Sequence, residues 1–438
     1  MSEAEATAAR RRLGIPSLAA IVVANMIGAG VFTTSGFALA DLGAPGWVLL
    51  AWVVGGALAV LGALCYGALA AYLRESGGEY LFLARTVHPR VGFVAGWISL
   101  FAGFTGAIAV AAEATAAYLA DTLPAWLSAD LLGSLLILAA GLLHAVRMAP
   151  GAWIQNVAVA VKLMLLTAMV IAGAWAILGA EPSGAAPSPE AGSAPGWGAF
   201  ATSLMWISLS YSGWNAAVYV AGEARDPRRD LPRALLLGTG AVIALYLVWN
   251  AVVLFAAPAD TLAGQPDVAA VAAEALGGAG WADAVRIVIA LALWTSVSSM
   301  VMVGPRVYAQ MAEDGALPRW LAFRGETPRA SIMLQVTLSI ALLHAYDLRE
   351  QLTNLGWILS LCTAMAVFGL LRERARVGAE RLPIVGGAAV AWVFLLATLG
   401  LTAIAFQANP GDLAYATGVL VTGALASFFS VRSAAAAG

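Results

Sequence analysis

The segment at residues 25–32 reads NMIGAGVF, and it lies inside a long apolar run at residues 13–42. A second run, at residues 197–221, is interrupted by Gly213 within the segment SYSGWN. Glycine inside a helix costs about 1 kcal/mol relative to alanine, so both interruptions need a reason. They indicate either close helix packing through small residues or local unwinding of two helices at comparable depths. Unwound segments expose N–H groups to an anion and carbonyls to a cation, which together suit a zwitterion.

The composition around these breaks is that of an integral membrane protein. Of the 438 residues, 61% are hydrophobic and 11% are charged, whereas a soluble domain carries about 25% charged residues. The recurring apolar runs are long enough to cross about 30 Å of hydrocarbon, so the spans are expected to be helices. We predict an all-α polytopic membrane protein with twelve transmembrane helices, at residues 13–42, 46–72, 91–120, 131–146, 152–179, 197–221, 234–257, 285–311, 332–344, 352–371, 382–406 and 412–431.

Arginine placement predicts the orientation of these helices, because cytoplasmic loops hold an excess of positive charge. With both termini in the cytoplasm, only Arg286 and Arg349 lie on the outer side, and Arg306 lies toward the cytoplasmic end of its helix. Residues 1–12 and 432–438 are then cytoplasmic tails. The outer loops, including residues 258–280, are too small for a soluble domain. We expect a multi-pass protein of the inner (cytoplasmic) cell membrane.

Four segments carry a family resemblance: IGAGVF, GALCYGALAAYLRESGGEYLFL, YSGWNAAVYVAGEARDPRRDLPRAL and RVYAQMAEDGALP. Together they resemble the amino acid, polyamine and organocation (APC) transporter superfamily, and GALCY and YSGWN are similar to its L-type amino acid transporter branch. The resemblance implies a LeuT-type fold of five plus five inverted helices, with helices one and six unwound at the midplane. Residues 13–180 and 197–372 would form the two repeats, and residues 382–431 would form helices eleven and twelve.

The resemblance also implies a substrate site at the two breaks. Backbone N–H groups in the first helix would bind the substrate carboxylate, while the carbonyls of Ile27 and of residues 209–211 would receive its ammonium. The implied residues are Ile27, Gly28, Ala29 and Gly30 in the first helix, Leu209, Ser210, Tyr211, Ser212, Gly213, Trp214 and Asn215 in the sixth, and Ser298 and Trp357 as further walls.

Two positions depart from the family pattern. Ala29 replaces the usual serine, which removes a hydroxyl but keeps the backbone donors. Leu209 occupies a position where the family often has an aromatic gate, so Trp214 or Trp357 is expected to close the site instead.

The apolar segment VAVAVKLMLLT, at residues 157–167, contains Lys162, the only lysine of the chain. It lies too deep in its predicted helix to reach either membrane surface easily. The resemblance implies that its ammonium replaces the sodium ion of sodium-coupled relatives, donating to carbonyls near Gly28 and to hydroxyls of the eighth helix. Ser296 and Ser299 share one face there, although they also suit ordinary helix packing. A buried lysine can give up its proton while arginine cannot, so a fixed tether and a proton carrier both remain open.

The predicted function is secondary active transport of small neutral L-amino acids by alternating access, as a sodium-independent exchanger. The alternatives are a proton-coupled amino acid symporter using Lys162 and an amine or polyamine transporter of the same superfamily. An enzyme is disfavoured because the three histidines and two cysteines are scattered, so no cofactor or metal site is expected. A channel is disfavoured because matching breaks indicate one central site.

The expected partners are the substrate and the lipid bilayer, with no nucleic acid. Animal members of the L-type branch link to a heavy subunit through a cysteine in the loop after helix three. The corresponding loop here, ADTLPAWLSAD, has none. Cys65 and Cys362 lie inside predicted helices and are expected to be reduced thiols. No disulfide-linked heavy subunit is therefore expected.

Overall fold

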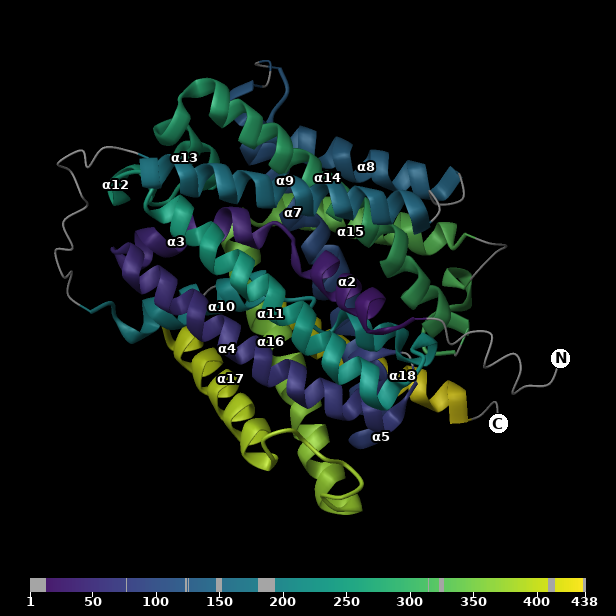
Figure 1. Ribbon diagram of the computed structural model, residues 1–438. Coiled ribbons are helices and arrows are strands. Elements are labelled where there is room, and N and C mark those ends of the chain that lie inside the picture. The colour runs from purple at the N-terminus through teal and green to yellow at the C-terminus, as the bar shows by residue number, and fades with distance from the viewer. Residues whose placement is uncertain are drawn as a thin grey trace.

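The chain folds as a bundle of helices (Figure 1). This computed structural model describes residues 13–75, 77–122, 124, 126–146, 152–179, 194–313, 315–322, 327–408 and 414–435. The tail at residues 1–12 therefore lies outside the described residues, and α18 continues to residue 435. Among the described residues the one β contact is an isolated bridge between Leu13 and Ala224.

Helices follow one another along the described parts of the chain, and most are separated by only a few residues. The first half contains α2 (Ile15–Met26), α3 (Gly30–Leu42), α4 (Pro45–Leu73), α5 (Gly78–Thr86), α6 (Pro89–Ile98), the π-helix η1 (Ser99–Gly106), α7 (Ala107–Leu119), η2 (Ala120–Thr122), α8 (Ala129–Val146) and α9 (Ala152–Gly179). The second half contains α10 (Trp197–Ser210), the 3-10 helix η3 (Ala216–Glu223), α11 (Pro227–Leu254), α12 (Ala259–Leu262), α13 (Val268–Gly277), α14 (Ala279–Glu313), η4 (Arg319–Leu321), α15 (Arg329–Ala345), α16 (Leu348–Val377), α17 (Ala388–Ala408) and α18 (Ala414–Ala435).

The length and hydropathy of these helices are those of a polytopic membrane protein. Seven helices in the described residues can each cross a membrane by length and composition, and α2 with α3, bent by 46° at a short break, makes an eighth if counted as one span. Other apolar helices, such as α8 and α15, are shorter. Each of the twelve predicted ranges overlaps a helix or a broken helix, and their number as membrane crossings stays a prediction.

Several helix ends differ from the sequence-based ones by four to seven residues, and for α11 the local reason is visible. Helix α11 begins at Pro227 rather than at residue 234, because the Asp226 side chain accepts from the Arg228 N–H and proline suits the first helical position. The outer segment 258–280 is not only a loop, since it contains α13. That helix is too short to resemble a span, yet one face, including Val268 and Ala272, is buried.

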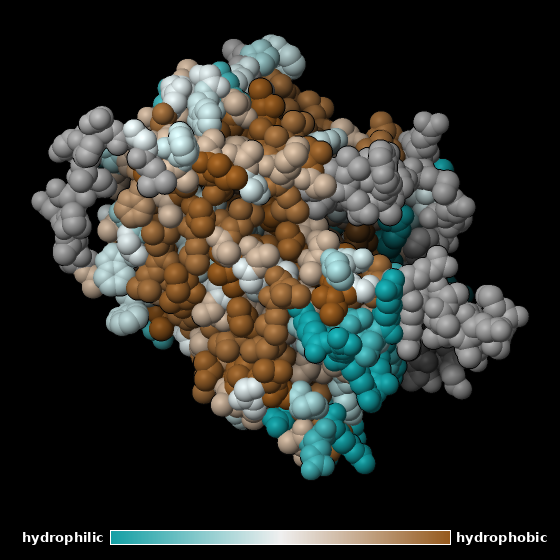
Figure 2. Space-filling view, viewed as in Figure 1, coloured by the Kyte–Doolittle hydropathy of each residue, from teal (hydrophilic) through white to brown (hydrophobic). Residues whose placement is uncertain are grey.

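The surface is consistent with lipid contact. Figure 2 shows hydrophobic side chains over most of the visible face, with hydrophilic ones gathered at the lower right, the end at which α5 lies in Figure 1. Large apolar side chains are exposed on several helices, among them Leu142, Ile171, Leu237 and Leu396. Soluble monomers rarely expose apolar surface so widely.

The break between α2 and α3 is braced by two neighbouring helices. The hydroxyl of Tyr246 on α11 donates to the carbonyl of Met26 at 2.7 Å. Ser35 on α3 donates to Asn250 Oδ1 at 2.5 Å and accepts from Trp52 Nε1 at 2.9 Å. A buried polar group without a partner is costly, so these bonds stabilise the interrupted geometry.

The second break, at residues 211–215 between α10 and η3, contacts the first one directly. Gly213 has a φ of +96°, and a Cβ there would lie 2.6 Å from the carbonyl oxygen of Asn25. A Cβ on Gly30 would lie 2.8 Å from the Cα of Ser210. The glycines therefore serve both purposes considered from the sequence: the helices are interrupted, and they cross closely.

We expect Gly213→Ala to lower the apparent melting temperature of the purified protein. Alanine is strained at positive φ by roughly 1–2 kcal/mol, and its Cβ would collide with the Asn25 carbonyl. Gly240→Ala on α11 is the matched control, because no atom lies within 4 Å of the added methyl group. Equal melting temperatures for the two variants would contradict the close crossing.

Candidate functional site

The unwound residues of the first helix present backbone groups that no helix satisfies. Ile27 has a non-helical ψ of 90°, and α3 restarts at Gly30 without a side-chain cap, because its N-cap residue is Ala29. The free N–H groups and the helix dipole both favour an anion at this point. A Cβ placed on Gly28 would meet no atom within 4 Å, so there is open space beside the break. A carboxylate can approach here.

Lys162 of α9 lies at the same break. Its ammonium donates to the carbonyl of Ile27, and it donates to Ser296 Oγ of α14 at 2.9 Å. The side chain is 5% exposed. One cation thus joins the first-helix break to two other helices, and both of its partners are uncharged. Ser299, half-buried one turn further along α14, has no such bond among the contacts of the described residues.

The predicted site residues of the sixth helix contact different parts of the protein. Ser210 is buried against Gly30 and hydrogen-bonded to Thr34 at 3.0 Å, facing the outer half of the first helix. Tyr211 donates to the Trp52 carbonyl at 3.2 Å and packs on α4. The carbonyl of Leu209 already accepts from the Ser212 N–H at 2.9 Å.

A small cavity of about 70 Å³ lies beside the second break, on the side of α4, α16 and α17. Four predicted site residues line it, namely Leu209, Tyr211, Ser212 and Trp214. Hydroxyl groups of Ser360 and Thr398 lie among otherwise mostly apolar neighbours. The cavity therefore adjoins the unwound segment and has a largely neutral lining.

Three other predicted residues are not among those that line this cavity. Ser298 is hydrogen-bonded to His144 Nε2 of α8 at 2.9 Å. Trp357 donates from its indole to the Thr402 carbonyl of α17 at 3.3 Å. Asn215 donates its amide to the carboxylate of Glu79 on α5. Sequence reasoning did not single out Glu79, although it lies in the quoted segment SGGEYLFL.

Aromatic side chains of the sixth helix contact three other helices. Trp214 packs edge-on against Tyr66 of α4, with ring centroids 4.7 Å apart. Trp206, one turn before Leu209, contacts Phe37 of α3 and donates to Thr353 Oγ1 of α16 at 2.8 Å. Closure of the site by Trp214 or Trp357 stays a prediction.

A charged pair covers Trp206 from the outer side. Arg349 at the start of α16 bonds Asp41 at the end of α3 at 2.5 Å, and its guanidinium lies 5.0 Å from the Trp206 ring centroid. At the opposite end, the Leu13 N–H donates to the Glu223 carbonyl at 3.0 Å. The two broken helices are therefore linked through Arg349 of α16 at one end and by the Leu13–Glu223 bond at the other.

We expect Ser296→Ala to lower the apparent melting temperature more than Ser299→Ala. The first substitution removes a hydrogen bond to a buried charged group, for which about 1–3 kcal/mol is typical, and the second removes a hydroxyl that does not contact Lys162. Thermal unfolding of both purified variants tests this, and a larger loss for Ser299→Ala would contradict the described contact.

Comparisons with known proteins identify the family of this chain. A family model described as amino acid permease matches residues 13–425. The chain is 26% identical to the Asc-type amino acid transporter 1 of Mus musculus, covering 98% of this chain and 82% of that protein. It is 26% identical to the large neutral amino acids transporter small subunit 2 of Homo sapiens, covering 97% and 81%.

A third relative is the b(0,+)-type amino acid transporter 1 of Mus musculus, at 24% identity over 85% of this chain and 78% of the relative. These proteins are transporters rather than enzymes. Among the described residues no group of three or more His, Cys, Asp or Glu side chains could hold a metal ion. The family match spans both helix breaks and Lys162, and this multi-pass membrane protein belongs to the amino acid permease family.

Proposed function

We propose that this protein is a secondary transporter that exchanges small neutral L-amino acids by alternating access, without sodium. The observation that carries the proposal is the arrangement at the first-helix break, where uncapped N–H groups of α3 lie next to a carbonyl held by Lys162. The relatives named Asc-type, large neutral and b(0,+)-type amino acid transporters support amino acids as the substrates.

The two breaks suit the two charged ends of an amino acid. The N–H groups of residues 28–30 would bind the carboxylate, since a helix N-terminus favours an anion. The ammonium would bind carbonyls of the breaks, including that of Ile27, whose oxygen retains a second lone pair beside its bond to Lys162. The mostly apolar cavity at Leu209 and Trp214 supports a neutral side chain.

Lys162 would act as a built-in substitute for a bound cation. Its ammonium satisfies a carbonyl that the interrupted helix leaves free and, through Ser296, ties that break to α14. A covalently attached charge needs no ion from solution, which is the physical basis for proposing sodium independence.

For the architecture we propose twelve spans with a five-plus-five inverted repeat, residues 13–180 against 197–372, and both termini cytoplasmic in the inner membrane. The paired breaks support it, because each interrupts the first helix of its half and the two cross at Gly30 and Gly213. We also propose that no disulfide-linked heavy subunit is present, since Cys65 and Cys362 are both buried. A cross-linked heterodimer on a non-reducing gel would contradict that.

Exchange is tested by counterflow in proteoliposomes loaded with radiolabelled L-alanine, L-serine or L-leucine. We expect efflux to rise about tenfold or more when the same unlabelled amino acid is added outside, because the empty carrier would reorient slowly. Empty liposomes serve as the control. Efflux that is equal with and without external amino acid would rule out exchange.

A proton-coupled symporter is the second candidate, favoured by the neutral surroundings of the Lys162 ammonium, whose partners are a carbonyl and a hydroxyl. Under this alternative, uptake into unloaded liposomes follows an inward proton gradient, and Lys162→Ala abolishes that dependence. Under exchange we expect no gradient dependence in the unsubstituted protein, and a loss of counterflow in Lys162→Ala. A variant that keeps full proton dependence would exclude coupling through Lys162.

Substrate class is tested by thermal stabilisation with the twenty amino acids and with putrescine. A ligand that binds only the folded state raises the apparent melting temperature by mass action. We expect the largest shifts for small neutral L-amino acids. Stabilisation by putrescine alone would favour the amine or polyamine alternative.

A further inference from the structure

Glu79 is an acidic residue buried beneath the sixth-helix break. It lies in the first turn of α5 and is 5% exposed. The amide of Asn215 donates to its Oε1, and the Tyr219 hydroxyl donates to its Oε2 at 2.5 Å. Asn215 belongs to the break and Tyr219 to η3. One carboxylate therefore joins the unwound segment to the inner half of the same helix.

The backbone before Glu79 is shaped for this contact. Gly78 has a φ of +58°, and a Cβ there would collide with the Tyr219 ring, lying 2.6 Å from its Cζ. Glycine permits both the left-handed conformation and the close approach. The start of α5 therefore contacts η3 closely. This contact places the Glu79 carboxylate within hydrogen-bond distance of Asn215 and Tyr219.

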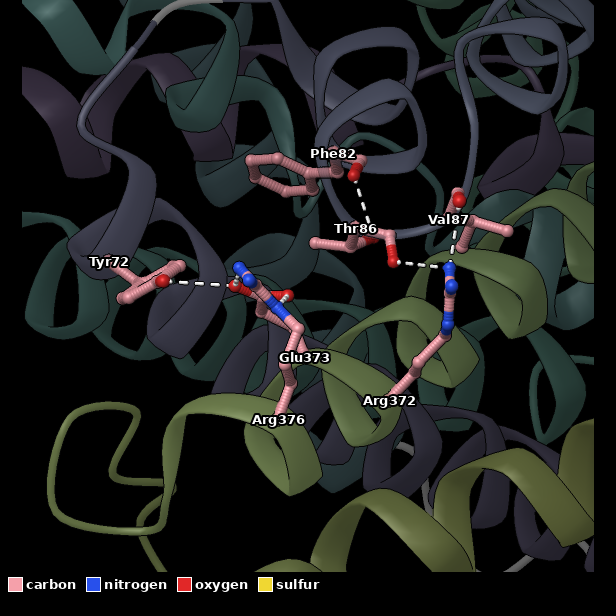
Figure 3. Close-up of polar contacts among 7 residues, drawn as sticks. All are labelled: Tyr72, Phe82, Thr86, Val87, Arg372, Glu373 and Arg376. Atoms are coloured by element: carbon pink, nitrogen blue, oxygen red, sulfur yellow. Dashed lines mark hydrogen bonds and ion pairs between the residues drawn. The ribbon is translucent and has the colours of Figure 1, made fainter.

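The other end of α5 is anchored to α16. Figure 3 shows the Arg372 side chain extending to the last carbonyls of α5, and its Nη1 donates to those of Thr86 at 3.0 Å and Val87 at 2.7 Å. A guanidinium at a helix C-terminus satisfies free carbonyls and complements the dipole. Glu373, beside it, accepts from Tyr72 of α4 at 2.9 Å. Helix α5 is therefore fixed to α16 by the Arg372 guanidinium, and its Phe82 packs edge-on against Tyr66 of α4.

The two bonds of Glu79 matter because its oxygens are surrounded by protein, where no water would replace a lost donor. A buried carboxylate is costly unless its oxygens accept hydrogen bonds, so the pairing favours one position for both donors. Asn215 is the N-cap residue of η3, and fixing its side chain restrains the turn at residues 211–215. That turn carries Tyr211, Ser212 and Trp214 at the cavity.

We propose that Glu79 is a positioning residue of the transport site: it holds Asn215 and Tyr219 so that the unwound sixth helix is organised for its amino acid before the amino acid binds. This inference rests on the proposed function and deepens it. Glu79 acts through Asn215 and Tyr219. Its helix, α5, is held in place by hydrogen bonds from Arg372 of α16.

The test measures KM and kcat for counterflow of radiolabelled L-alanine, L-serine or L-leucine, whichever the unsubstituted protein exchanges best. We expect Glu79→Gln to raise KM about tenfold, because both oxygens of Glu79 accept hydrogen bonds and the glutamine amide would present an NH2 group in place of one of them. Tyr219→Phe removes one donor and should raise KM about threefold. In the double variant the effects should not add, because both substitutions disrupt one interaction.

Glu75→Gln is the matched control, since Glu75 precedes α5, is exposed and pairs with Arg85 at 3.0 Å. It should leave KM and kcat unchanged. A purely structural role for Glu79 would reduce the amount of folded protein and the maximal rate at constant KM, and that result would overturn the inference. If Glu79→Gln does not fold, the KM of Tyr219→Phe decides, and an unchanged value overturns the inference. An unsubstituted protein without counterflow would instead refute the proposed function.

Discussion

The ammonium of Lys162 satisfies a carbonyl that the interrupted first helix leaves without a helical partner, and the rest of the structure is arranged around that interruption. In a membrane, a backbone group at such a break has no water to bond with, so the protein must supply the partner. Lys162 supplies one at Ile27 and Tyr246 supplies another at Met26. The N–H groups at the start of α3 receive no side-chain cap, which leaves them available to a ligand.

Three aromatic side chains pack together near the two breaks and help to fix their relative position. Trp52 of α4, Tyr211 of the second break and Tyr246 of α11 lie in mutual contact, with ring centroids between 5.3 and 5.5 Å apart. Each also makes a polar contact at or near a break. Packing and hydrogen bonding thus act through the same residues, so the unwound segments are ordered although they lack helical bonds.

Helix α16 connects the outer and inner ends of the site. Near its start, Arg349 pairs with Asp41 over Trp206, and near its end, Arg372 holds α5, from which Glu79 reaches Asn215. Because Leu348–Val377 is one continuous helix, the polar contacts at its two ends belong to one body. Under the proposed alternating access, a tilt of that body would change both sets of contacts together.

The sequence by itself determined the helical class, the two breaks and the importance of Lys162. Long apolar runs, interrupting glycines and a single charge in an apolar run are local features, and each can be recognised within one segment of the chain. It also indicated Ser296, since serines on one face of α14 were natural partners for an ammonium. Only the tertiary structure decided that Trp206 contacts Phe37 and Thr353, that Ser298 pairs with His144, and that Glu79 accepts from Asn215. Those contacts join residues far apart in the chain, and which face of each helix meets which neighbour depends on packing that no single segment encodes.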